Sequence, residues 1–163
     1  MKRLMSAGAI ALVLLAVGSS AGSAQGVVIT GDSIDAARAL SEANNTVDRL
    51  IDGGEVPGGR FALAALRRVR AETNGLIHSD VTEVYYITEG SGTLVTGGTL
   101  ADPRDTDLSR VWAGASISGT HQGGEARRVG PGDVIVVPAG TVHRLSELDG
   151  VIRYLVFRFE AVD

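Results

Sequence analysis

The sequence predicts an all-β protein, a single jelly-roll β-barrel that follows an N-terminal helical arm. From Phe61 onward, short apolar or alternating runs recur at near-regular spacing between glycine-rich turns, which is typical of sandwiches and jelly rolls. Before Phe61 the apolar residues recur at helical spacing instead. The 163 residues suffice for one such domain, and the sequence shows no internal repeat.

The first two dozen residues are expected to lie outside this fold. Lys2 and Arg3 precede the uncharged apolar run 7–17, and small residues follow as far as Ala24. This order is typical of a bacterial secretory signal, and the alternative is an uncleaved N-terminal anchor. We expect residues 1–24 to be removed, which leaves a periplasmic or secreted protein without a membrane anchor.

Residues 25–58 are expected to form the helical arm. Asp32 is a credible N-cap, and apolar residues then recur at roughly helical spacing as far as Ile51. The pair Asn44-Asn45 can break the helix into two, and Gly53-Gly54 ends the pattern. Such a helix would cover a sheet edge or contact a partner subunit.

Residues 59–163 are expected to form the barrel. The stretch 99–110 is polar and contains a proline, which favours a loop, and 120–124 favours a second flexible connection. Strands are predicted at 61–71, 76–79, 83–88, 93–96, 125–129, 134–137, 143–146 and 151–159, with a further extended stretch at 116–119.

Composition excludes several kinds of chemistry. The chain has no cysteine, so disulfides, thiol nucleophiles and thiolate metal sites are ruled out. Its only lysine is Lys2, so the mature chain has no lysine for a Schiff base or a P-loop. Without residues 1–24, 13 arginines face 19 acidic residues, a net charge of −6. No nucleic-acid partner is expected from that balance.

Two stretches carry the pattern of a known family. The second stretch reads G-x5-P-x-G-x2-H from Gly132 to His143, and the first ends in E-x6-G from Glu83 to Gly90. Together they resemble the two sequence motifs of the cupin superfamily, over roughly residues 59–163. The resemblance implies a jelly-roll barrel whose motif residues point inward, and it implies no single activity.

The first motif departs from the family pattern, which begins H-x-H and reaches glutamate after three or four further residues. With a gap of four, His78 takes the second histidine position and Leu76 the first, where it cannot bind a metal. If His78 is the first histidine instead, Asp80 takes the second position and the gap to Glu83 is too short. Both alignments stay open at this stage.

The resemblance implies a metal site in the barrel made by His78, Glu83 and His143. Two imidazoles and one carboxylate suit Fe(II), and also Mn, Ni or Zn. Asp80 and His121 are further candidates for the metal or the pocket. Because side chains alternate along a strand, the residues on the same faces should line the pocket. These residues are Leu76, Tyr85 and Ile87.

Two classes of function remain open, beside a third possibility, a degenerate barrel that serves only as an oligomerisation unit. One is a small metal-dependent enzyme, an oxygenase or isomerase, that acts on a small polar molecule. The other is a non-catalytic cupin that binds a small ligand without metal. Leu76 at a ligand position favours the second class, and the retention of three ligands favours the first. A homodimer is expected in either case.

Overall fold

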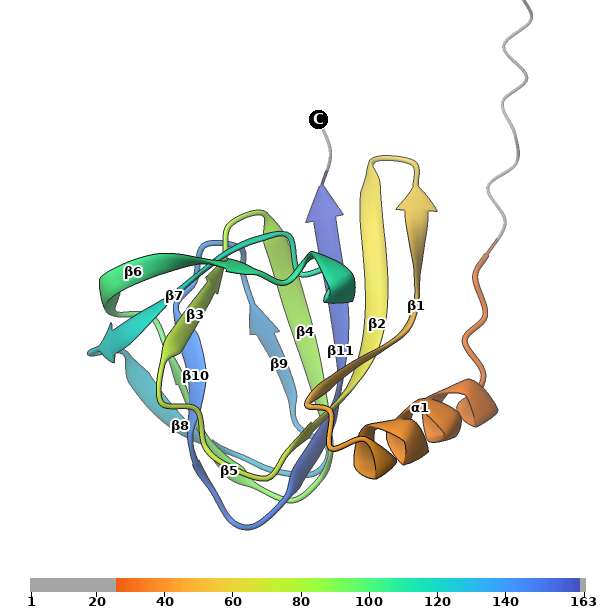
Figure 1. Ribbon diagram of the computed structural model, residues 1–163, viewed down its shortest axis with the longest axis horizontal. Coiled ribbons are helices and arrows are strands. Elements are labelled where there is room, and N and C mark those ends of the chain that lie inside the picture. The colour runs from red at the N-terminus through yellow and green to blue at the C-terminus, as the bar shows by residue number, and fades with distance from the viewer. Residues whose placement is uncertain (1–25, 162–163) are drawn as a thin grey trace, which may run out of the picture.

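Two antiparallel sheets and one helix make up the fold (Figure 1). The computed structural model describes residues 26–161, so the expected signal segment 1–24 lies outside the described residues. The elements are α1 (Gly31–Ala43), β1 (Asp48–Val56), β2 (Gly59–Arg68), β3 (Gly75–His78), β4 (Val81–Glu89), β5 (Gly92–Thr96), β6 (Thr99–Asp107), the 3-10 turn η1 (Ser109–Val111), β7 (Ala115–Gln122), β8 (Glu125–Val129), β9 (Val134–Val137), β10 (His143–Leu148) and β11 (Ile152–Ala161).

The strands form two facing layers. One sheet has the order β1-β2-β11-β4-β9 and the other the order β6-β7-β3-β10-β5-β8. The last strand, β11, lies between β2 and β4, so segments far apart in the sequence pair side by side. The predicted all-β jelly roll with an N-terminal helix is confirmed. The predicted strand regions from residue 61 onward are confirmed as well, within a few residues at their ends.

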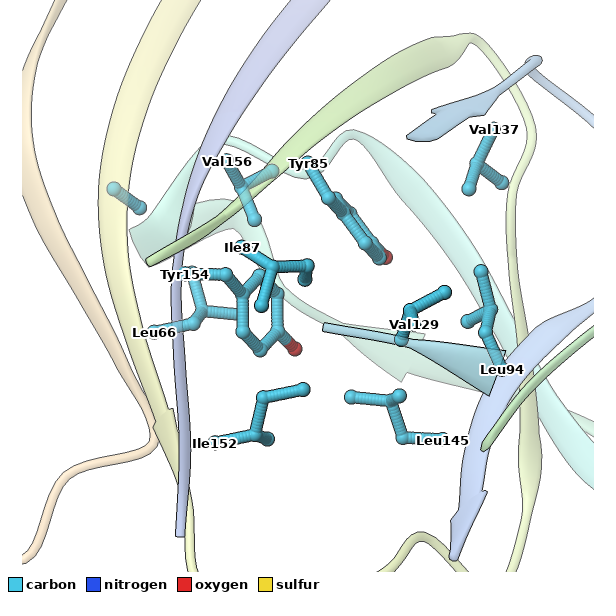
Figure 2. Packing of buried hydrophobic residues seen from close by; sticks show 11 residues of the cluster. Leu66, Tyr85, Ile87, Leu94, Val129, Val137, Leu145, Ile152, Tyr154 and Val156 are labelled. Atoms are coloured by element: carbon cyan, nitrogen blue, oxygen red, sulfur yellow. The ribbon is translucent and has the colours of Figure 1, made fainter. Parts of the chain in front are cut away.

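An apolar core fills part of the space between the sheets (Figure 2). Further along the inward faces of β4 and β11, the alternation continues with Glu83 and Arg158, which are also buried. The interior therefore changes from apolar to polar along the same two strands. The buried apolar cluster comprises Ala64, Leu66, Tyr85, Ile87, Leu94, Val129, Val137, Leu145, Ile152, Tyr154 and Val156.

Helix α1 packs on the outer face of the five-stranded sheet, where Ala37 contacts a small cluster that includes Leu63 and Leu155. Its N-cap is Thr30, whose hydroxyl accepts a hydrogen bond from the backbone N–H of Ser33. The prediction of Asp32 as the cap is wrong, because Asp32 lies in the first turn. Within residues 26–161, no helix is both long and apolar enough to cross a membrane.

The prediction of helical structure as far as Ile51 is also wrong. The helix ends at Ala43, Asn45 turns the chain with a φ of 49°, and β1 follows. β1 pairs with β2 from Asp48 opposite Leu66 onward. The backbone groups of this segment pair with the next strand in a hairpin that turns at Pro57-Gly58, and the helical spacing of the apolar residues does not reveal this pairing.

The predicted loop at 99–110 contains strand β6, followed by η1. β6 is the edge strand of its sheet, and its pairing with β7 is irregular between Ala101 and Arg104, around Pro103. A proline and many polar residues are tolerated at such an edge. Likewise β7 continues to Gln122, through part of the stretch expected to be flexible.

The turn η1 joins β6 to β7 within the six-stranded sheet and contacts β1 of the other sheet. It ends on Trp112, which has a left-handed φ of 56°. A Cβ atom at Gly53 would lie 3.2 Å from a carbon of the indole ring, so a glycine in β1 lets Trp112 lie against this strand. On its other side, η1 contributes Val111 to the interior of the fold.

Candidate metal centre

Three inward-facing side chains converge between the two sheets. Glu83 extends from β4 in one sheet, while His78 ends β3 and His143 begins β10 in the other. All three residues are buried, with at most 4% of their surface exposed. One nitrogen or oxygen atom from each lies within 4.8 Å of the other two. The structure thus brings together the three residues that the two motifs singled out.

The turn of the second motif holds the two histidines in place. The backbone N–H of Gly140 donates to the carbonyl of His78 at 2.8 Å, and that of Ala139 donates to Thr82 Oγ1 at 3.2 Å. His143 follows three residues later and pairs across the strands with Leu76. The proline–glycine turn therefore fixes the end of β3 and starts β10 beside it.

The spacing of the three donor atoms suits a metal ion. Glu83 Oε2 lies 3.5 Å from Nε2 of His78 and 3.5 Å from Nε2 of His143. Ligand atoms at about 2.1 Å from a tetrahedral ion are separated from one another by about 3.4 Å. The carboxylate oxygen and each nitrogen are therefore as far apart as two ligands of one ion.

Each imidazole has a hydrogen-bond partner on Nδ1. His143 donates from Nδ1 to the carbonyl of Thr141 at 3.0 Å. Nδ1 of His78 lies 2.8 Å from the hydroxyl of Ser116, whose oxygen also lies 3.2 Å from the carbonyls of residues 113 and 114. In the neutral tautomer that carries its proton on Nδ1, each ring presents an unprotonated Nε2 to the carboxylate. Neutral imidazole nitrogens of this kind are metal ligands.

Glu83 is an ionised carboxylate with distinct partners on its two oxygens. Oε1 accepts from Nε of Arg158 at 2.9 Å, and Oε2 accepts from the hydroxyl of Tyr85 at 2.7 Å. Burial alone would raise the pKa of Glu83, but His78, Arg158 and His143 outweigh it and hold this pKa below the usual range. Burial lowers the pKa of His143 despite the nearby carboxylate, which favours its neutral ring.

Arg158 is a site residue that the sequence reasoning missed. It is 3% exposed and, besides Glu83, it binds Asp48 Oδ2 at 2.6 Å and the carbonyl of Val111 at 2.7 Å. The sequence does contain an indication of this role. Arg158 lies two residues after the buried Val156 on β11, so both side chains point to the inward face, where a charged residue is unusual.

A cavity of about 520 Å³ adjoins the three residues. Leu76 and Tyr85 line it, as predicted, whereas Ile87 lies in the apolar core. Its polar lining comes from the three candidate ligands and from arginines, with Asp48 and Asn45. The full lining is Asn45, Thr46, Val47, Asp48, Leu66, Arg68, Leu76, His78, Glu83, Tyr85, Leu108, Arg110, Val111, His143 and Arg158.

The two further candidates, Asp80 and His121, are not part of the group. Asp80 is exposed in the turn after β3. His121 lies on β7, where Nε2 hydrogen-bonds the carbonyl of Gly97 at 2.7 Å. Of the two alignments of the first motif, the one that places four residues between His78 and Glu83 therefore agrees with the geometry.

One solved structure supports the fold, and two others match it more weakly. A protein from Bacillus halodurans superposes with a TM-score of 0.50 at 14% identity, over 83% of this chain and 82% of that one. A DMSP lyase, DddQ from Ruegeria pomeroyi, gives 0.40 at 19% identity, over 62% of this chain and only 38% of the lyase. A predicted oxalate decarboxylase from Thermotoga maritima gives 0.40 at 16%, over 75% and 74%. The lyase and decarboxylase names belong to those two proteins and not to this chain.

No curated protein matches the chain in sequence. The sequence model of one family, described as cupin, matches residues 55–146. That range is more than half of the chain, and it contains both motifs and all three converging residues. The protein therefore belongs to the cupin family.

Proposed function

We propose that this protein is an exported cupin that holds a divalent first-row metal ion through His78, Glu83 and His143. The observation that carries this proposal is the convergence of Nε2 of His78 and Nε2 of His143 on one carboxylate oxygen of Glu83, each at 3.5 Å. With the proton of each ring on Nδ1, beside Ser116 and the carbonyl of Thr141, all three atoms are electron-pair donors. Two imidazoles and one carboxylate form a ligand set for a divalent first-row ion.

Such an ion would supply Lewis acidity and open positions for a chelating molecule. The protein residues have separate tasks around it. Ser116 and the carbonyl of Thr141 hold the two imidazoles in the ligand tautomer, and Tyr85 orients the carboxylate. Fe(II), Mn, Ni and Zn all suit two imidazoles with one carboxylate.

The adjoining cavity supports a small polar molecule as the ligand or substrate. Its walls are apolar at Val47, Leu66 and Leu76, while Arg68 and Arg110 provide charged groups for orientation. Arg110 is exposed and forms no ion pair within the part of the chain that the structure describes. A polar group of the bound molecule can therefore pair with Arg110.

A second function, the binding of a small ligand without metal, is favoured by one observation. Both oxygens of Glu83 already have hydrogen-bond partners, Arg158 and Tyr85, so the carboxylate is stable in the barrel without an ion. In this alternative, the same cavity would bind the molecule through Arg68 and Arg110 alone.

Metal content separates the two functions. Mature protein is stripped with a chelator, exposed anaerobically to equal amounts of Fe(II), Mn, Ni and Zn, freed of excess ion and measured by elemental analysis. We expect about one equivalent in the wild type and essentially none in His143→Ala, because two remaining ligands rarely hold an exchangeable ion.

The matched control is His121→Ala, since it removes a histidine outside the group. This variant should keep the metal content of the wild type. Equal content in wild type and His143→Ala would contradict the metal site and leave the binding of a small ligand without metal as the better account of the cavity.

A further inference from the structure

We propose that Asp48, at the start of β1, is a positioning residue that sets how strongly the His78–Glu83–His143 group holds a cation. Asp48 would do so through Arg158, which it shares with Glu83. This inference rests on the proposed metal-binding function. Asp48 belongs to neither family motif, and it lies seven residues before the range that the family model matches.

Arg158 is fixed between two carboxylates. Its Nε donates to Glu83 at 2.9 Å, Nη2 donates to Asp48 at 2.6 Å, and Nη1 donates to the carbonyl of Val111 at 2.7 Å. The arginine side chain is only 4% exposed, against 22% for that of Asp48. Burial would lower the pKa of Arg158, but Asp48 and Glu83 raise it well above the ordinary value, so the guanidinium stays charged.

A guanidinium bound to Glu83 opposes a second cation on the same carboxylate. Imidazoles that bind a metal ion are neutral, so Glu83 and Arg158 alone then carry no net charge, and Asp48 brings the set to −1. These charges lie inside the protein, where they interact more strongly than in water. Asp48 therefore offsets the arginine and leaves Glu83 with negative charge for a metal ion.

The fold holds Asp48 beside Arg158, where its carboxylate can offset the charge of the guanidinium. It is the first residue of β1, opposite Leu66 of β2, directly after the turn that ends α1. Residues 45–48 also form one wall of the cavity. The segment before the family motifs thus supplies both a wall and a charge to the site.

The test compares the Zn²⁺ affinity of Asp48→Asn with that of Glu55→Gln, measured by competition with a chromophoric chelator. Glu55 is an exposed acid on the same strand, so its variant loses the same charge away from the site. We expect Asp48→Asn to bind Zn²⁺ about 10–100-fold more weakly than wild type, the effect usual for outer-shell partners of metal ligands. Glu55→Gln should bind like wild type.

The double variant Asp48→Asn, Arg158→Gln separates charge from structure. The double variant restores the net charge of −1, so it should recover most of the lost Zn²⁺ affinity. If the role of Asp48 is only structural, the double variant should bind Zn²⁺ at least as weakly as Asp48→Asn. Circular dichroism checks that each variant folds. If the double variant does not fold, the comparison of Asp48→Asn with Glu55→Gln decides alone.

The measured Zn²⁺ affinities test the role of Asp48 and the metal site separately. Equal Zn²⁺ affinities in wild type and Asp48→Asn, or equal losses in Asp48→Asn and Glu55→Gln, overturn the role of Asp48 and leave the metal site intact. Failure of the wild type itself to bind Zn²⁺ or the other ions overturns the proposed function together with this inference.

Discussion

The neutral ring of His143 has a consequence for stability in acid. Burial lowers the pKa of this residue below its ordinary value of 6.5, so the unfolded chain takes up the proton more readily than the folded one. The free energy of unfolding of the metal-free protein should therefore fall as the pH drops through and below 6.5.

Urea unfolding in the presence of a chelator, at about pH 7.5 and about pH 5.5, measures this decrease. His143→Gln should show a smaller decrease than wild type, and His121→Gln the same decrease. An unchanged decrease in His143→Gln would contradict the assignment of this pH dependence to His143.

At the scale of residues, the sequence predicts the three converging side chains better than their surroundings. His78, Glu83 and His143 were identified from motif spacing, because turn residues such as Pro138 and Gly140 fix where a strand delivers its histidine. Asp48 and Arg158 were missed because they lie 110 residues from each other, and Arg158 lies 75 residues from Glu83, beyond any local pattern.

At the scale of elements, Gly90 shows why the first motif ends in glycine. Gly90 follows β4 with a φ of 72°, and a Cβ atom there would lie only 2.0 Å from the carbonyl oxygen of Val151, just before β11. The chain thus approaches the strand that carries Arg158 more closely than any side chain allows.

Gly90→Ala should therefore lower the free energy of unfolding more than Gly132→Ala does. Gly132 also has a positive φ, 92°, but open space surrounds its Cβ position. Left-handed strain alone costs about 1–2 kcal/mol, which is the loss expected for Gly132→Ala. Chemical denaturation measures both variants, and equal losses would show that the contact with Val151 relaxes freely.

The sequence predicts the wrong secondary structure where pairing between strands outweighs the local pattern of residues. The sequence predicts 125–129 and 134–137 with the observed bounds, because glycines in turns lie next to both, and 134–137 is also a β-branched run. For β1 the sequence predicts a helix, because the first apolar residues of this strand also fit helical spacing. For β6 it predicts a loop, because polar residues and a proline are typical of loops and of exposed edge strands alike.

At the scale of the whole molecule, the outer face of the five-stranded sheet is partly covered by α1 and partly apolar and exposed. Val134 and Val136 on β9 are 62% and 59% exposed, and Tyr86 on β4 is 43% exposed. Val134 pairs with Tyr86 across the strands, so these side chains form one patch. An exposed apolar patch of this kind is typical of an interaction site, so we expect the homodimer to form through it.

Native mass spectrometry of a periplasmic extract tests export and assembly together. We expect a species with twice the mass of a chain that begins near Gln25, since the small residues before it suit signal cleavage. A full-length chain that begins with Met1 in the cytoplasm would contradict export. A mature monomer at micromolar concentration would contradict only the dimer.

The position of Trp112 gives the protein a built-in optical probe. It is the only tryptophan of the chain, it is 37% exposed, and it directly follows Val111, whose carbonyl accepts from Arg158. We expect an event in the barrel that displaces Arg158 to change the surroundings of this single indole. Its fluorescence emission would then follow that event by titration, without a label.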